Sequence, residues 1–131
     1  MPSPNPPLLD MDEQRLQAYL NLIESLLTCP SEEEIEILQA NLELIDDGFA
    51  QYLREWATES LPTLDAEEAY NRANILCGLN FTFYNLRQGS RASNLEVGIA
   101  CLEIGLTVVT REAYSEKWAT CQNNLAGAYL Y

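Results

Sequence analysis

Apolar side chains recur every three or four residues along most of the chain, which is the spacing of one face of an α-helix. The first run covers residues 11–28 and stops before Pro30, because the residue that precedes a proline avoids the helical region. A second, short run begins at Ser31 and ends near Ala40, and a third covers residues 42–59. The pattern therefore predicts three helices before the break at Pro62.

The second half of the chain repeats this spacing after a break at residues 60–63, which contains a proline. Apolar positions there predict helices over residues 65–88, 94–110 and 115–131. The long runs contain no interior proline, which favours helices throughout. The predicted fold class is therefore all-α, a helical bundle or α–α superhelix of about six helices.

Residues that often begin helices stand ahead of several of these runs. Asp10, Ser31, Asp65 and Ser93 each have a glutamate three residues later, which is the spacing of a capping box. We therefore expect these four residues to be N-caps. Gly89 follows the fourth run and is predicted to close the end of that helix.

Proline content and charge divide the chain into three parts. Residues 1–9 are rich in proline and are predicted to be a disordered leader. We expect an N-terminal helical segment over residues 10–61 and a second helical segment over residues 64–131. The two segments either share one core or form two, and the sequence leaves this open.

The net charge of −13 resides mostly in residues 1–60, which hold 13 acidic and 2 basic side chains. This sign disfavours binding to nucleic acid or to an anionic membrane surface. No apolar run approaches the ~20 residues that span a bilayer, and the N-terminus does not resemble a signal peptide, so we expect a cytoplasmic protein. We interpret the acidic residues as a solvated face, with a surface that steers a basic partner as the alternative.

The four cysteines, at positions 29, 77, 101 and 121, stand among apolar residues and are predicted to be buried free thiols. They form no CxxC pair, and the chain has no histidine, so neither a metal site nor a cofactor is expected. The absence of histidine also removes the usual base for a cysteine nucleophile. We therefore predict no catalytic residues and no enzymatic activity.

Two segments of the second half follow a similar pattern. Placing Leu79 on Leu125 also places Phe83 on Tyr129, an offset of 46 residues. Each copy then has a leucine, a small or polar residue after it, and an aromatic residue one turn later. This is the pattern of two related helices, each the first helix of a pair.

Three runs carry a family resemblance: GSRASNLE at residues 89–96, TRE at residues 110–112 and WATCQNNLAGAY at residues 118–129. By these runs, residues 75–131 resemble the tetratricopeptide repeats of cyanobacterial tandem-repeat proteins. The family's usual proline is replaced by Ser115 in this chain.

The resemblance implies one full helical hairpin and the first helix of a second. Two alanines of the family's second helix are Gly98 and Gly105 here, and each glycine weakens a helix by about 0.5–1 kcal/mol unless closer packing compensates. The packing positions that the resemblance implies are Leu79, Phe83, Gly98, Leu102, Gly105, Leu125, Ala126 and Tyr129.

In tetratricopeptide repeats the first helix of each unit lines a concave groove that binds extended peptides. Asn124 matches an asparagine that can hold the peptide backbone, a role that suits an amide because it both donates and accepts hydrogen bonds. Its alternative role is a contact between helices or with water. The residues that the resemblance places towards the groove are Asn74, Phe81, Tyr84, Asn85, Thr120, Asn123, Asn124 and Gly127.

The function implied by the resemblance is non-enzymatic protein–protein interaction, as a scaffold or adaptor that binds a peptide or a partner protein. Residues 1–60 also resemble a leader found ahead of such repeats in proteins that often carry a C-terminal caspase-like (CHAT) peptidase domain. The alternative function is therefore a regulatory or oligomerisation segment of a caspase-like peptidase system.

The apolar face of the predicted last helix requires a cover, because it holds Trp118, Leu125 and Tyr129. The N-terminal helices, a second copy of the chain in a homodimer, or further repeats of a longer protein would each supply one. The sequence leaves these three alternatives open.

Overall fold

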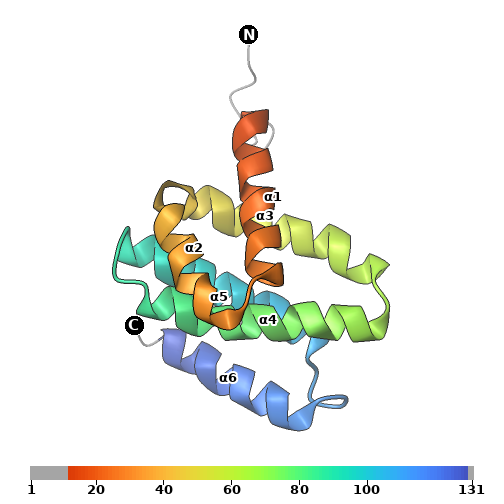
Figure 1. Cartoon of the computed structure of the whole chain (residues 1–131). Helices are drawn as coiled ribbons and strands as arrows, with labels where there is room; N and C mark the ends of the chain where they lie inside the picture. Colours follow the sequence, from red (N-terminus) through yellow and green to blue (C-terminus); the bar gives the residue numbers. More distant parts are fainter. Residues whose placement is uncertain (1–11, 130–131) are drawn as a thin grey trace.

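The computed structural model describes residues 12–129, and helices account for most of them (Figure 1). This part of the chain contains six α-helices, three 3-10 turns and no strand, which confirms the predicted all-α class. The predicted leader at residues 1–9 and the predicted cap Asp10 lie outside the described residues. The helices are α1 (Glu13–Thr28), α2 (Glu34–Ala40), α3 (Asp47–Ser60), α4 (Ala66–Asn85), α5 (Arg91–Val108) and α6 (Ser115–Tyr129), and the turns are Ser31–Glu33, Leu42–Leu44 and Leu61–Thr63.

Aspartates begin three of these helices. Asp12 caps α1 and Asp46 caps α3. Asp65 caps α4 by accepting a hydrogen bond from the backbone N–H of Glu68 (2.8 Å), which confirms its predicted role. The helix predicted from residue 42 begins later than expected, because Leu42–Leu44 form a 3-10 turn ahead of the cap of α3.

The two predicted serine caps are wrong. Ser31 begins a 3-10 turn ahead of α2, and no side chain caps α2 itself. Ser90 rather than Ser93 caps α5, because its hydroxyl accepts a hydrogen bond from the backbone N–H of Ser93 (3.2 Å). The buried Asn94 holds the preceding loop in place by donating from its amide to the carbonyl oxygen of Gln88 (3.0 Å). This contact ties α5 to the loop that contains its cap.

Gly89 lies in the loop between α4 and α5, where the chain reverses direction. Its φ of +79° lies in the left-handed region that favours glycine. The prediction that Gly89 closes the last turn of α4 is wrong, because the C-cap of that helix is Leu86. α4 ends earlier, at Asn85, and two side chains donate to carbonyl groups of its last turns. The Asn85 amide donates to the carbonyl oxygen of Phe81 (2.9 Å), and the Arg91 guanidinium donates to that of Tyr84.

Asp46 also ties α1 to α3. Its Oδ1 accepts a hydrogen bond from the hydroxyl of Tyr19 (2.7 Å), and Arg15 forms an ion pair with its Oδ2. Burial raises the pKa of Asp46, but the hydrogen bonds from Tyr19 and Arg15 outweigh burial, and the pKa lies below its usual value. The ring of Tyr19 packs on the ring of Phe49, with the two centroids 5.4 Å apart. Tyr19 therefore links α1 to α3 by both a polar and an apolar contact.

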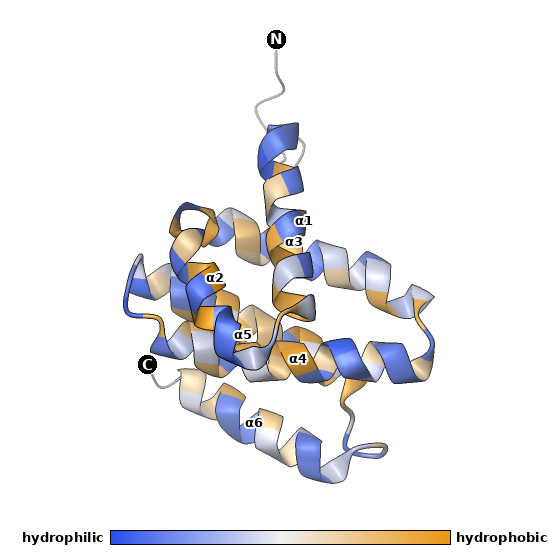
Figure 2. Ribbon diagram, viewed as in Figure 1, coloured by the Kyte–Doolittle hydropathy of each residue, from blue (hydrophilic) through white to orange (hydrophobic). Residues whose placement is uncertain are grey.

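α5 lies in the middle of the fold, with α3, α4 and α6 packed against it (Figure 1). Apolar residues gather where α2, α4 and α5 meet (Figure 2). One core cluster contains residues from both sides of the turn at Leu61–Thr63, so the two predicted segments share a core. Its largest fully buried side chains are Tyr19, Ile23, Leu38, Phe49, Leu76, Leu79, Phe83, Leu86 and Val97.

Two glycines of α5 face α4 and allow the two helices to approach closely. A Cβ atom at Gly98 would lie 3.4 Å from the Cβ of Phe83. A Cβ atom at Gly105 would overlap the Sγ of Cys77 and lie 3.1 Å from the carbonyl oxygen of Ala73. Close packing of α5 on α4 therefore compensates for the weak helix propensity of Gly105.

We predict that Gly105→Ala destabilises the protein, although alanine is the better helix former. The new Cβ forces α4 and α5 apart, and overpacking of this kind costs about 1–3 kcal/mol. Gly78→Ala is the matched control, because Gly78 is exposed within α4 and a Cβ there meets nothing within 4 Å. That control should stabilise the protein by about 0.5–1 kcal/mol. Urea unfolding followed by circular dichroism measures both changes, and shifts of the same sign would contradict the close contact.

Candidate functional site

α4 and α6 run in the same direction (Figure 1). Two contacts, seven residues apart along the chain on both sides, join α4 to α6 and to the residue just before α6. The rings of Tyr70 and Tyr114 stack with their centroids 4.2 Å apart. Seven residues further along the chain from each tyrosine, the sulfur atoms of Cys77 and Cys121 lie 2.9 Å apart. Seven residues make about two helical turns, so these contacts follow one edge of each helix.

A groove opens between the C-terminal parts of α4 and α6, beyond these two contacts. It has a volume of about 210 Å³. Five of the eight residues predicted for a binding groove line it together: Phe81, Tyr84, Asn123, Asn124 and Gly127. The ring of Phe81 is 54% exposed, which is unusual for so large an apolar side chain in this protein. The full lining is Asn80, Phe81, Tyr84, Asn123, Asn124, Gly127 and Ala128.

Two adjacent amides supply the polar side of the groove. Within residues 12–129, neither Asn123 nor Asn124 has a hydrogen-bond partner for its side chain. Asn123 is exposed and Asn124 is half-buried. The opposite wall is aromatic, and the guanidinium of Arg91 lies over the ring of Tyr84, 4.7 Å from its centroid. The groove thus places free donors and acceptors opposite an apolar surface.

Three other residues predicted for the groove lie outside it. Asn74 is exposed on α4 and does not line the groove. The Asn85 amide is engaged at the end of its own helix, as described above. The hydroxyl of Thr120 donates to the carbonyl oxygen of Glu116 (3.1 Å), one turn earlier in α6. Hydrogen bonds within their own helices therefore occupy two of the three side chains.

Asn80 and Ala128 line the groove but were not predicted to do so. The sequence pattern aligned the two copies with an offset of 46 residues. The residues that contact each other, Cys77 with Cys121 and Tyr70 with Tyr114, are instead 44 residues apart. The same spacing of 44 residues relates Tyr84 to Ala128. A search for aromatic and cysteine residues at seven-residue spacing would have found this register.

The predicted packing positions divide into buried and exposed residues. Leu125 is half-buried and packs against a small cluster formed by Cys77, Leu102 and Cys121. Ala126 is exposed. The buried positions are Leu79, Phe83, Gly98, Leu102 and Gly105.

Tyr129 is 61% exposed, although the repeat pattern places it at a packing position. Its hydroxyl donates a hydrogen bond to Oε2 of Glu103 (2.8 Å). The other carboxylate oxygen of Glu103 accepts from the guanidinium of Arg54 (2.8 Å). One carboxylate of α5 therefore links α3 on one side to the end of α6 on the other.

The environment of Glu103 favours its charged form. Burial raises its pKa, but the hydrogen bonds from Arg54 and Tyr129 outweigh burial, so the pKa lies below the usual value of a glutamate. The stability that this link supplies is fully present above the pKa that Glu103 has in the unfolded chain. It is lost as the pH falls through the lower pKa that Glu103 has in the folded protein.

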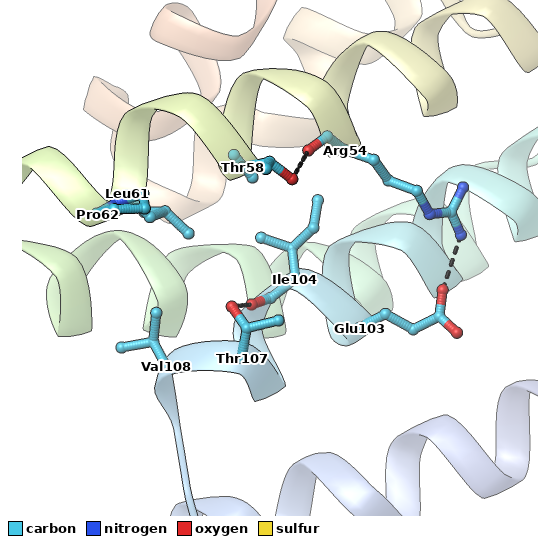
Figure 3. Close-up of a pocket in the computed structure, with 9 residues that line it drawn as sticks. Arg54, Thr58, Leu61, Pro62, Glu103, Ile104, Thr107 and Val108 are labelled. Atoms are coloured by element: carbon cyan, nitrogen blue, oxygen red, sulfur yellow. Dashed lines mark hydrogen bonds and ion pairs between the residues drawn. The ribbon is translucent and has the colours of Figure 1, made fainter.

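A larger cavity of about 570 Å³ lies between α3, the turn at Leu61–Thr63, and α5 (Figure 3). The hydroxyl of Thr58 donates to a backbone carbonyl oxygen at 2.9 Å, and that of Thr107 to another at 2.7 Å. Arg54 and Glu103 at its edge pair with each other. The polar groups of this cavity thus already have partners. Its apolar walls are Ala57, Leu61, Pro62, Ile104 and Val108.

The remaining chemistry of the described residues is sparse. They include no group of three or more cysteine, aspartate or glutamate side chains placed to hold a metal ion. None of the described helices is long and apolar enough to cross a membrane. The four cysteines are free thiols, and all but Cys29 are buried.

Comparisons of the chain with protein-family models, with curated proteins and with solved structures give no match. The resemblance to tetratricopeptide repeats therefore stays a prediction.

We predict that Glu103→Ala loosens the C-terminal end of α6, because it removes the acceptor of the Tyr129 hydroxyl. Amide hydrogen exchange in the last turns of α6 should become roughly two- to fivefold faster, as expected for an exposed polar link. Glu96→Ala is the matched control, since Glu96 also pairs with Arg54 (3.4 Å) but forms no hydrogen bond with Tyr129. Equal acceleration in both variants would show that Glu103 does not hold α6.

Proposed function

We propose that this chain is a non-enzymatic protein-interaction module that binds an extended peptide segment of a partner protein between α4 and α6. The observation that carries the proposal is the pair of amides at Asn123 and Asn124, without partners among the described residues, opposite the exposed ring of Phe81.

The chemistry of the groove suits a peptide backbone. An asparagine side chain donates through Nδ2 and accepts through Oδ1, so it matches the carbonyl oxygen and the N–H of a peptide group. Asn124 is half-buried, and a hydrogen bond there is better shielded from water than one at the exposed Asn123. These contacts do not depend on the partner's side chains. Selectivity then comes from the apolar side chain that packs on the exposed ring of Phe81.

The size of the groove favours a peptide segment over a small molecule. Sites for drug-sized ligands usually enclose about 300–1,000 Å³. The groove has about 210 Å³, which is enough for one or two side chains of an extended segment. A peptide needs no closed cavity, because most of its length lies along the surface.

The charge of the chain favours a basic partner. A net charge of −13 attracts positively charged proteins over long range and raises their association rate at low ionic strength. This effect steers the approach of the partner, whereas the amides and the ring of Phe81 hold it.

Another binding site and another function have less support in the geometry. The cavity between α3 and α5 is larger, but its polar groups are already paired, so it offers apolar contact without directional hydrogen bonds. A regulatory or oligomerisation role in a caspase-like peptidase system rests on the resemblance of residues 1–60 alone.

We predict that selection from a displayed library of random peptides enriches ligands for this chain, and that Asn124→Ala weakens their binding. Loss of one such hydrogen bond, at about 0.5–1.5 kcal/mol, corresponds to an affinity roughly two- to tenfold lower. Phe81→Ala should weaken binding at least as much, because it removes the apolar wall. Isothermal titration with an enriched peptide measures both changes, and circular dichroism checks that the helices remain.

Two control variants locate the binding site. Asn74→Ala changes an exposed asparagine of α4 outside the groove and should leave the affinity unchanged. Thr107→Lys places a long side chain over the cavity between α3 and α5 and should also have no effect. If Thr107→Lys abolishes binding while Asn124→Ala and Phe81→Ala do not, the peptide binds in the larger cavity and the proposal is wrong.

A further inference from the structure

We propose that Cys77 and Cys121 form an oxidation site, at which a peroxide converts the two thiols into a disulfide bond that joins α4 to α6. The bond would be a modification of the folded chain. It does not depend on the proposed peptide binding.

The placement of the two sulfur atoms carries the proposal. They lie 2.9 Å apart, on helices that are otherwise joined near this point by the stacked rings of Tyr70 and Tyr114. A disulfide bond is about 2.05 Å long, so the sulfur atoms need to approach by less than about 1 Å. We expect rotation of the two side chains to supply most of this movement.

The packing around Cys77 holds its sulfur atom in this position. Gly105 of α5 has no side chain, and the Sγ of Cys77 fills the place that a Cβ atom would take. Leu102 packs on the other side of the same cluster. The thiol therefore points along the α4–α6 contact. Cys101 provides the contrast, because it is equally buried in the main core but its thiol forms no hydrogen bond with another thiol among the described residues.

Burial of the pair sets the rate of its oxidation. Burial, followed by the hydrogen bond from Cys121, raises the pKa of Cys77, while the charge of Lys117 acts weakly in the opposite direction. The thiolate is the reactive form, so the packed pair reacts slowly with a peroxide. α6 packs on a small cluster of three buried residues, so we expect the reaction to proceed when local opening of α6 exposes the thiols.

The chemical balance is simple. A thiolate of the pair attacks one oxygen of hydrogen peroxide, an S–O bond forms, the O–O bond breaks, and hydroxide leaves. The second thiol attacks the resulting sulfenic sulfur, the S–O bond breaks, and the S–S bond forms with release of water. In total, two thiols and one hydrogen peroxide give one disulfide and two waters. A dithiol reductant reverses the change.

The bond would fix the two sides of the candidate groove relative to each other. Phe81 lies one turn beyond Cys77 on α4, and Asn124 lies one turn beyond Cys121 on α6. A covalent link at the base of the groove keeps α6 against α4 in the position that brings these two residues together. This consequence rests on the proposed function, whereas the bond itself does not.

The test uses the full chain with Cys29→Ser, which removes the more accessible thiol. After treatment with hydrogen peroxide, mass spectrometry of unreduced peptides should find one cross-linked pair containing Cys77 and Cys121. Cys101 should remain a free thiol. The melting temperature should rise by at least about 5 °C, because the bond closes a long loop, and dithiothreitol should reverse the rise.

The control variants are Cys77→Ser and Cys121→Ser, each of which should abolish the cross-link and the rise in melting temperature. Three results overturn the proposal without reliance on these variants. The first is a pair that stays reduced when the peroxide treatment is continued well beyond the time that fully oxidises the more accessible Cys29 of the parent chain. The second is accumulation of sulfinic acid in place of the bond, and the third is oxidation of Cys101 as fast as that of the pair.

The peptide assay is carried out separately on the reduced and oxidised chains. A cross-link that forms while no peptide binds either state would leave the oxidation site intact and remove the proposed function. A peptide that binds the reduced chain, in a protein that forms no cross-link, would leave the proposed function intact and remove the oxidation site. The two proposals therefore fail by different measurements.

Discussion

The close approach of α4 and α5 is the contact on which the rest of the fold depends. Gly105 leaves room for the Sγ of Cys77, and Gly98 lets Phe83 pack directly on the backbone of α5. Each glycine weakens α5 by about 0.5–1 kcal/mol as an isolated helix. The helix nevertheless forms because it lies in the middle of the fold, where α3, α4 and α6 surround it. Tertiary packing here outweighs helix propensity.

The same contact also determines where the candidate groove lies. With Cys77 held against α5, its thiol meets Cys121 and sets the register of α6 on α4. The stacked pair of Tyr70 and Tyr114 lies seven residues earlier, and the groove begins two or three residues later on each helix. The groove thus continues one regular edge, and Tyr84 and the small Ala128, seven residues beyond the two cysteines, both line it.

The helices could be predicted from the sequence because apolar periodicity is a local signal, and Asp65 was identified as a cap for the same reason. The cap of α5 could not be chosen locally, since Ser90 and Ser93 are both of a residue type that often begins helices. Five of the groove residues could be predicted, because periodicity indicates which side chains share one face of a helix. The position of Tyr129 could not be predicted in this way, because its hydroxyl bonds to Glu103, which belongs to another helix.

The weak attachment of α6 connects the groove and the thiol pair in thermodynamic terms. α6 is held by a small buried cluster and by the link from Tyr129 to Glu103. A peptide that contacts both walls of the groove binds the docked form of α6 better than the displaced form, so it stabilises docking. A bond between Cys77 and Cys121 stabilises the same docked form. Linkage is reciprocal, so the factor by which the bond strengthens peptide binding equals the factor by which the peptide favours the bond.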